Sequence, residues 1–136
     1  MNKNTFLAAA AVVVLLTAAT QKDDVISREG DTIVVNTTSL TSGVIGYMST
    51  TPVKIYIKDG VVQRVEALPN QETPKYFNAA AKTVLPQWQG LKVKKARQQH
   101  IDGRTGATMS SDALIRNVQE GLDYYNKANY KAGKVK

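Results

Sequence analysis

The sequence predicts a small α+β domain in which two amphipathic helices cover a small antiparallel sheet. A β-hairpin is indicated over residues 53–67, where apolar and polar side chains alternate on both sides of an Asp-Gly turn. Two stretches, at about 74–85 and 110–125, place apolar side chains at helical spacing. Each helix has one apolar stripe, so both must pack on the sheet or on each other. The 136 residues are enough for one such domain.

Two further strands are expected before the hairpin. Residues 32–38 are rich in β-branched side chains, which favour extended backbone. Residues 43–48 form another short segment that we interpret as a strand. The mixed-charge residues 20–31 that precede both are expected to be a leader, so the domain itself is placed at 32–126.

The loop of the hairpin is expected to have three residues. A two-residue turn at the Asp-Gly would place apolar residues of one strand opposite polar residues of the other. A loop over 58–60 keeps one apolar face, because it pairs Ile57 with Val61 and Val53 with Val65. The pattern therefore predicts a type I turn followed by a bulge, with the glycine in the left-handed conformation.

Capping residues set the expected ends of the two helices. Thr73 is placed to cap the first, Pro74 occupies its first turn, and a proline at 86 ends it. Ser110 or Ser111 is expected to cap the second. Trp88 lies between the helices and is expected to pack over the core.

The N-terminus has the features of a secretory signal. Lys3 precedes an unbroken run of apolar and small residues over 6–19, and the run ends on small residues that suit a signal peptidase. Fourteen helical residues rise about 21 Å, which is less than the roughly 30 Å of a bilayer core. We therefore interpret 1–19 as a signal peptide, with an uncleaved signal anchor as the alternative. The mature protein is then expected in the periplasm or cell envelope.

Composition excludes several classes of protein. With no cysteine, the chain has no disulfide, thiolate metal site, iron–sulfur cluster or covalent c-type haem. With one histidine, a cage of histidines alone within one chain is also excluded, and no metal is expected. The net charge of +7 suits nucleic acid, but export argues against that partner, so none is expected. Residues 127–136 are basic and are expected to form a flexible tail.

The segment from 102 to 111 is the most informative for function. Its glycines permit tight backbone, and its hydroxyls stand beside the start of the second helix. Free N–H groups and the helix dipole make such a place suitable for anions, phosphates above all. An ordinary capping loop is the alternative, because small polar loops before helices are common.

The order of residues in this segment resembles the flavinylation motif of FMN-binding domains. Asp102 and Thr105 are followed by Gly106, Ala107 and Thr108, with a serine close behind. Such domains occur in the Rnf electron-transport complex and in the sodium-translocating NADH:quinone reductase. The resemblance implies that Thr108 carries FMN through a phosphodiester, installed by a flavin transferase that uses FAD as donor.

A second element resembles the same family, and with the hairpin and the segment at Gly46-Tyr47, which also look like this domain, the resemblance covers about residues 43–126. Asn70-Gln71-Glu72-Thr73-Pro74 is similar to the family's His-x-Glu-Thr-Pro-Gly, although asparagine replaces the histidine and Lys75 replaces the glycine. The expected cofactor-binding residues are Thr108 as acceptor with Asp102, Gly103, Arg104, Thr105, Gly106, Ala107, Ser110, Ser111, Glu72 and Thr73.

Charged and aromatic residues extend this expectation. No acidic residue lies between Glu72 and Asp102, whereas six basic residues do. These basic side chains either form a solvated face or, in part, face the flavin. Arg104 is the best candidate for a phosphate contact. Four aromatic residues are candidates to stack on the flavin ring or to pack in the core, and one histidine is a candidate to flank it: Tyr47, Tyr76, Phe77, Trp88 and His100.

The sequence thus predicts an exported flavoprotein that transfers electrons and has no substrate of its own. Its expected partners are a flavin transferase and an unidentified redox partner, such as a membrane electron-transport complex. A module that binds flavin or another phosphate ligand reversibly is the alternative. A hydrolase is disfavoured because no Gly-x-Ser-x-Gly is present. A structural envelope protein with a basic tail is the remaining alternative.

Overall fold

The computed structural model describes residues 23–131, with side chains described to residue 128. The predicted signal at 1–19 lies outside these residues. Four strands form one antiparallel sheet in the order β1-β2-β3-β4. The elements in chain order are β1 (Ile26–Glu29), β2 (Thr32–Asn36), β3 (Val53–Lys58), β4 (Val61–Ala67), α2 (Pro74–Val84), the 3-10 helix η1 (Leu85–Trp88), α3 (Val93–Ala96) and α4 (Thr108–Lys131). The predicted α+β class is confirmed.

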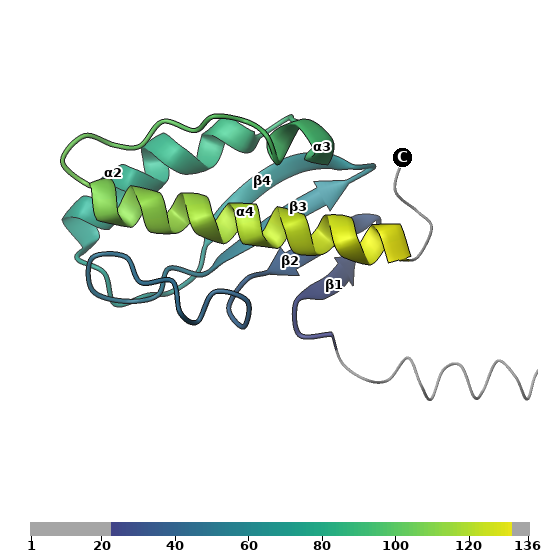
Figure 1. The fold of residues 1–136 in the computed structure, drawn as a ribbon, viewed down its shortest axis with the longest axis horizontal. Coiled ribbons are helices and arrows are strands. Elements are labelled where there is room, and N and C mark those ends of the chain that lie inside the picture. The colour runs from purple at the N-terminus through teal and green to yellow at the C-terminus, as the bar shows by residue number, and fades with distance from the viewer. Residues whose placement is uncertain (1–22, 132–136) are drawn as a thin grey trace, which may run out of the picture.

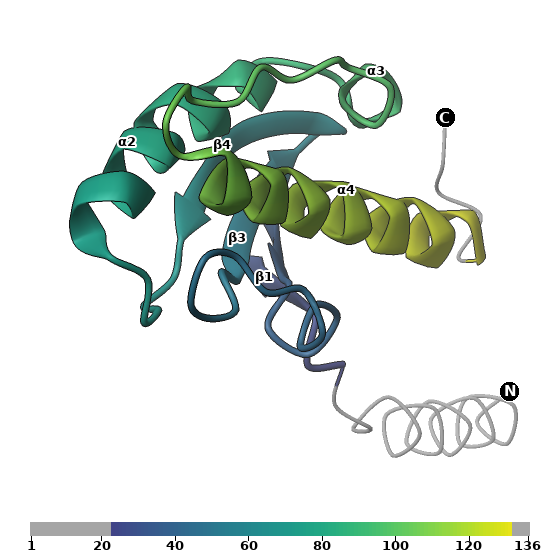
Figure 2. The same cartoon turned by 60° about the vertical axis from the view of Figure 1, so that its left-hand side comes forward.

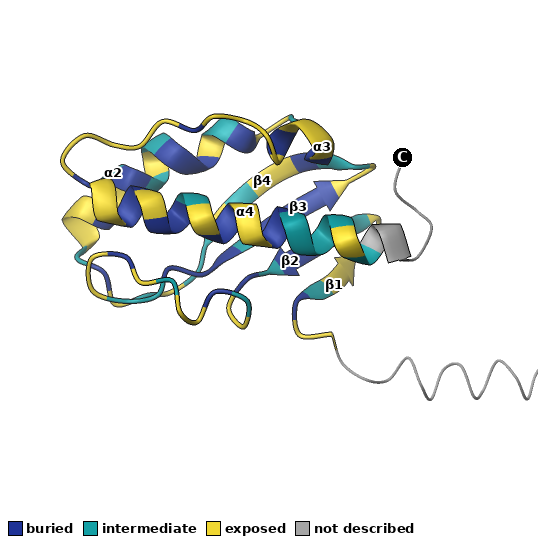
Figure 3. Cartoon of the chain, in the orientation of Figure 1, coloured by how far each residue is buried: buried dark blue, intermediate teal, exposed yellow. Residues whose placement is uncertain are grey.

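The two long helices lie on the same face of the sheet, as Figures 1 and 2 show. Helix α4 contacts β2, β3 and α2, and η1 contacts β4. One core fills the space between the layers, and Figure 3 marks the buried residues in dark blue along the ribbon. The largest are Trp88, Ile55, Ile57, Leu114 and Leu122. Trp88 is fully buried in η1, as the sequence predicted.

The first strand lies inside the segment that was expected to be a leader. β1 pairs with β2 from Ile26 opposite Val35 to Glu29 opposite Thr32. The two-residue turn between them places Gly30 at φ 61°. Val25, just before β1, is buried in the core. Residues 25–29 are therefore part of the folded domain, which begins earlier than residue 32.

The register of the β3–β4 hairpin differs from the prediction. Lys58 pairs with Val61, so the loop has two residues, and both have positive φ (Asp59 52°, Gly60 74°) as in a type I′ turn. The left-handed glycine is confirmed, but the three-residue loop is wrong. A shift in register after Tyr56 leaves Gln63 as an extra residue in β4. This bulge restores the apolar face inside the strand, because Ile55 then lies opposite Val65 and Val53 opposite Ala67.

Residues 43–48 do not form the predicted strand. The chain from 37 to 52 is a loop with one isolated bridge, between Ile45 and Thr50. Its first part is tied to α4 by the buried Asn117, whose Oδ1 accepts hydrogen bonds from the hydroxyls of Thr37 (2.7 Å) and Thr41. Asn117 Nδ2 also donates to Thr51 Oγ1 at 3.2 Å. Hydrogen bonds to a side chain from a distant part of the chain therefore hold this loop in place, and pairing with a neighbouring strand does not.

The helix ends also differ in detail from the prediction. Helix α2 ends at Val84, and the 3-10 helix η1, which contains Pro86, follows it directly. Helix α4 begins at Thr108, before the serines that were expected to cap it, and continues to Lys131. The predicted tail at 127–136 therefore begins within the helix, and 132–136 lie outside the described residues. No helix within residues 23–131 is long and apolar enough to cross a membrane.

Candidate functional site

A pocket of about 450 Å³ lies at the end of the molecule where α2 and α4 begin. Its volume falls in the range of about 300–1,000 Å³ that is typical of small-molecule sites. Residues from three separate segments line it: Tyr47 of the loop, Tyr76 of α2, and Gly106, Ala107, Thr108, Met109 and Ser110 at the start of α4. Both tyrosines are substantially exposed, at 60% and 47%. The pocket therefore has aromatic side chains and an open mouth.

Thr108 lies in this pocket as the first residue of α4, and it is exposed. The expected position of this hydroxyl beside the start of the second helix is confirmed. The preceding loop makes a turn in which Ala107 N–H donates to the carbonyl of Arg104 at 3.0 Å, with Gly106 at φ 85°. The first N–H groups of α4 are close to the Thr108 hydroxyl, and a helix start favours negative charge.

The two serines of the motif are buried and already engaged. Ser110 Oγ donates to Glu72 Oε1 at 2.7 Å, and Ser111 Oγ accepts a hydrogen bond from Arg104 N–H at 2.9 Å. Neither caps the helix, because both lie inside its first turns. Thr108 and Thr105 are therefore the exposed hydroxyls of this segment, and of the two only Thr108 lines the pocket.

Glu72 is a buried carboxylate that binds the loop opposite α4. Its Oε1 accepts hydrogen bonds from Tyr47 N–H (2.9 Å) and Ser110, and its Oε2 accepts from Met48 N–H and Ser49 N–H (2.8 Å). Burial alone would raise the pKa of this carboxyl, but the hydrogen bonds outweigh it and hold the pKa below its usual value. Glu72 does not line the pocket, although the sequence placed it among the cofactor contacts.

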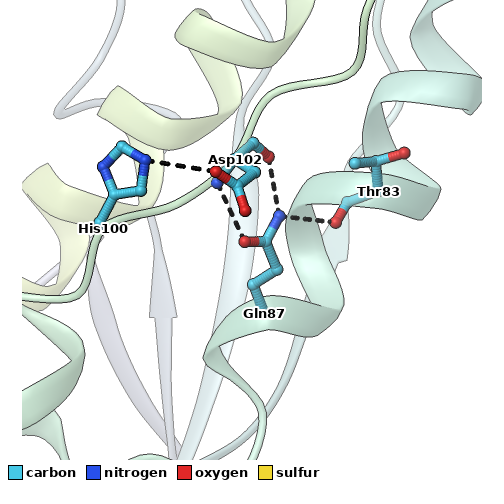
Figure 4. A network of polar contacts seen from close by, with 4 residues as sticks. All are labelled: Thr83, Gln87, His100 and Asp102. Atoms are coloured by element: carbon cyan, nitrogen blue, oxygen red, sulfur yellow. Dashed lines mark hydrogen bonds and ion pairs between the residues drawn. The ribbon is translucent and has the colours of Figure 1, made fainter.

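Asp102 is fixed through its backbone by one glutamine. Gln87 Nε2 donates to the Asp102 carbonyl at 2.7 Å and to the Thr83 carbonyl at 2.9 Å, and Gln87 Oε1 accepts from Asp102 N–H at 3.0 Å (Figure 4). The Asp102 carboxylate lies 3.3 Å from His100 Nε2, and both side chains are exposed. This arrangement holds the motif loop against α2 and η1, and it leaves the carboxylate outside the pocket lining.

The remaining predicted residues do not line the pocket. Gly103 packs against Ser111, since an added Cβ would come within 3.2 Å of the serine Cβ. The side chain of Arg104 is exposed. Thr73 Oγ1 donates to the Met48 sulfur at 3.5 Å and makes no side-chain cap hydrogen bond to α2.

The aromatic and basic residues that were candidates to contact the flavin lie in different places in the structure. Phe77 and Trp88 belong to the core, whereas Tyr47 and Tyr76 belong to the pocket. Of the six cations, Lys75 lies near the pocket, with Nζ 5.7 Å from the centre of the Tyr76 ring. Arg97 instead pairs with Asp123 at 2.9 Å.

Sequence reasoning missed three residues that build the site: Gln87, Asn117 and Met109. Asn117 is a polar residue within the apolar stripe of α4, and that position is a signal of a buried polar network. Met109 directly follows the expected acceptor, but its exposure was not foreseeable before the start of α4 was known. Gln87 carries no comparable signal, because its partners are main-chain atoms.

Fold and site together define a small cofactor-binding domain, with an aromatic pocket beside a helix start that favours an anion. The family is identified by comparison: a family model described as FMN-binding domain matches residues 46–123, and the chain belongs to this family. The protein is thus an FMN-binding flavoprotein by family. The comparisons with curated proteins and with solved structures produced no match.

The residues of the pocket fit FMN in chemical type. Aromatic side chains suit a flat ring system, and a helix start with an exposed hydroxyl suits a phosphate. The matched region begins at Gly46, beside Tyr47, and includes Glu72 and Thr108. It therefore contains every residue that lines the pocket.

Proposed function

We propose that this protein is an exported electron carrier that holds FMN covalently through a phosphodiester to Thr108. The observation that carries the proposal is the state of the motif hydroxyls: Thr108 is exposed in the pocket, whereas Ser110 and Ser111 are buried and hydrogen-bonded. A hydroxyl that must enter another enzyme's active site has to be free of internal partners and accessible from outside.

The attachment step is a phosphoryl transfer from FAD. The Thr108 oxygen forms a bond to the phosphorus on the flavin side, the bond to the bridging oxygen breaks, and AMP leaves with that oxygen. The hydroxyl proton passes to a base of the flavin transferase, because no carboxylate or histidine among the described residues lines the pocket. The phosphodiester keeps one negative charge, which the start of α4 stabilises by about 0.3–1 kcal/mol.

The bound flavin supplies the redox chemistry, and the chain supplies position and charge. Tyr47 and Tyr76 give the ring aromatic surfaces to contact. Lys75 adds a positive charge beside Tyr76, and a nearby cation favours the anionic reduced flavin and raises its potential. The open mouth of the pocket leaves the ring accessible to a redox partner instead of enclosing a substrate.

The surface around the pocket suits protein partners. Among residues 23–128, five large apolar side chains stand out as exposed, and all belong to the loop or to the first turns of α2 and α4: Ile45, Tyr47, Met48, Tyr76 and Met109. Apolar side chains gathered at one end of a domain mark interaction surfaces. A flavin transferase and a redox partner of the cell envelope, such as a membrane electron-transport complex, are the partners that we propose.

Coexpression with a flavin transferase tests the attachment. We expect the purified protein to gain the mass of an FMN phosphoryl adduct and to fluoresce as a band in a denaturing gel. Thr108→Ala should abolish both signals, Thr108→Ser should keep part of them, and Thr105→Ala should weaken them. A full adduct on Thr108→Ala would show that the acceptor is another residue. Flavin that is released on denaturation of the wild type would show a reversible binding module instead.

Export is tested separately from flavin. We expect the mature chain, recovered from the envelope fraction of its host, to begin near residue 20. A chain that keeps Met1 and fractionates with membranes would indicate a signal anchor. A chain that keeps Met1 and stays in the cytoplasm would contradict export.

A further inference from the structure

We infer that Glu72 is a positioning residue of this site, which fixes the Tyr47 side of the pocket relative to Thr108 and touches no part of the ligand. The inference concerns how the pocket is assembled, and its flavin readouts rest on the proposed function. It replaces the expectation that Glu72 contacts the cofactor.

The hydrogen bonds of Glu72 connect the two sides of the pocket. Three consecutive backbone N–H groups, those of Tyr47, Met48 and Ser49, donate to its two carboxylate oxygens. The fourth donor, Ser110, belongs to the first turn of α4. One carboxylate therefore fixes the loop that carries Tyr47 against the helix turn that carries Thr108.

The loop fits closely around this carboxylate. A Cβ at Gly46 would lie 2.5 Å from Glu72 Oε1 and 3.3 Å from Thr51 Cγ2. Any side chain at 46 would therefore push the loop away from the carboxylate. Gly46 N–H donates to the Ser49 carbonyl at 2.8 Å, which closes the loop into a tight turn around the carboxylate.

Glu72 itself is held in place from its own side. Its N–H donates to Asn70 Oδ1 at 2.9 Å, and the Gln71 N–H donates to Ser49 Oγ at 3.0 Å. Asn70 stands where the family motif has histidine, so in this chain its side chain serves the backbone of Glu72. The Thr73 hydroxyl adds a contact to Met48 at 3.5 Å. Residues 70–73 thus together hold the loop in place, and we assign them no contact with a ligand.

Loss of the carboxylate should release the loop while Thr108 remains available. The three N–H groups would then lose a buried, charged acceptor, and hydrogen bonds to charged groups are stronger than those between neutral groups. Glu72→Gln replaces one acceptor oxygen by an NH₂ group that faces donors. Gly46→Ala keeps the carboxylate, but its added Cβ would push the loop away from Glu72 Oε1. Glu120→Gln, an exposed acid of α4, is the matched control.

Amide hydrogen exchange on the flavin-free protein is the first test. We expect the amides of residues 47–49 to be protected in the wild type and in Glu120→Gln. Both Glu72→Gln and Gly46→Ala should speed their exchange by about tenfold or more, while amides in the centre of β3 keep their protection. Unchanged exchange at 47–49 in both variants would overturn the inference, whatever the flavin experiments show.

The flavin-loaded protein supplies the second test. We expect Glu72→Gln to accept FMN on Thr108, as measured by intact mass, but to show a changed visible circular dichroism spectrum and midpoint potential of the flavin. Glu120→Gln should match the wild type in both. A wild-type spectrum and potential in loaded Glu72→Gln would overturn the inference. Failure of the wild type to load would contradict the proposed function instead, and would leave the exchange test to decide the role of Glu72.

Discussion

Gln87 holds Asp102 by two hydrogen bonds to its backbone, in the way that a neighbouring strand would. The amide nitrogen donates to the Asp102 carbonyl at 2.7 Å, and the amide oxygen accepts from the Asp102 N–H at 3.0 Å. A third hydrogen bond, to the Thr83 carbonyl, fixes the glutamine to the end of α2. The loop that leads to Thr108 is therefore held at its start by a side chain of η1.

Gln87→Ala should loosen this loop and leave the core intact. Each lost hydrogen bond is worth about 0.5–1.5 kcal/mol, and the two to Asp102 are exposed, so we expect a global destabilisation of about 1–2 kcal/mol. The initial rate of FMN attachment should fall several-fold, because Thr108 is no longer held in one position. Stability is measured by urea unfolding and attachment by intact mass over time.

The control for Gln87→Ala is Gln89→Ala, which removes an exposed glutamine just after the same 3-10 helix. It should load at the wild-type rate. Equal rates in both variants and the wild type would show that the glutamine contact does not matter for attachment.

Asn117→Ala should destabilise the domain by about 2–4 kcal/mol. The change removes an amide that accepts from two threonine hydroxyls and donates to Thr51 and to the carbonyl of Ala113, all in a buried setting. Gln119→Ala, at an exposed position of the same helix, should change the stability by less than about 0.5 kcal/mol. Urea midpoints compare the two. A similar small effect for both would mean that water replaces the amide without penalty.

The elements with regular periodicity were predictable from the sequence, and the loops that depend on distant partners were not. The stripe from Leu114 to Leu122 placed α4 on the sheet, because a single apolar face can be buried in only one way. The 43–48 segment looked like a strand by composition alone. Its conformation is decided instead by Glu72, 25 residues from Tyr47, and the start of the same loop by Asn117, 80 residues from Thr37.

In the hairpin, too, the sequence predicted the strands but not their detailed pairing. Alternation located both strands and the Asp-Gly turn, but it assumed an uninterrupted register. The bulge at Gln63 restores the apolar face inside β4, so a two-residue turn fits the pattern after all. The position of Thr108 was predictable through the motif, whereas its place inside the helix was not, because Ala107 lacks the side-chain oxygen of a typical cap.

Gly121→Ala should destabilise the protein, although alanine is the better helix former by about 1 kcal/mol. An added Cβ would lie 2.6 Å from Ile55 Cδ1 and 2.9 Å from Thr37 Cγ2, where α4 crosses the sheet. Overpacking of this kind usually costs about 1–3 kcal/mol. Gly43→Ala is the matched control, because nothing lies within 4 Å of an added Cβ there.

Ile55→Val removes the closer of the two clashing atoms and should partly rescue Gly121→Ala. We expect the double variant to be more stable than the sum of the two single changes predicts, by about 0.5 kcal/mol or more. The double-mutant cycle is measured by urea unfolding. Strict additivity would show that α4 shifts away from β3 instead of meeting the Ile55 methyl.

The last prediction concerns the dependence of stability on pH through Glu72. Its pKa is lower in the folded protein than in the unfolded chain, because the hydrogen bonds from Ser110 and the loop amides outweigh the effect of burial. The ionised carboxylate therefore contributes stability at pH values above the ordinary glutamate pKa of about 4.3, and this contribution disappears as the pH falls through the lower folded value. Glu72→Gln lacks the titrating group, so the stability difference between it and the wild type should be largest near neutral pH and should shrink below about pH 4.

Glu120→Gln, on the exposed face of α4, should follow the wild type at every pH. Urea unfolding at a series of pH values from about 7 to about 3 measures all three proteins. A difference between Glu72→Gln and the wild type that stays constant across this range would show that the carboxyl of Glu72 has the same pKa in the folded protein as in the unfolded chain.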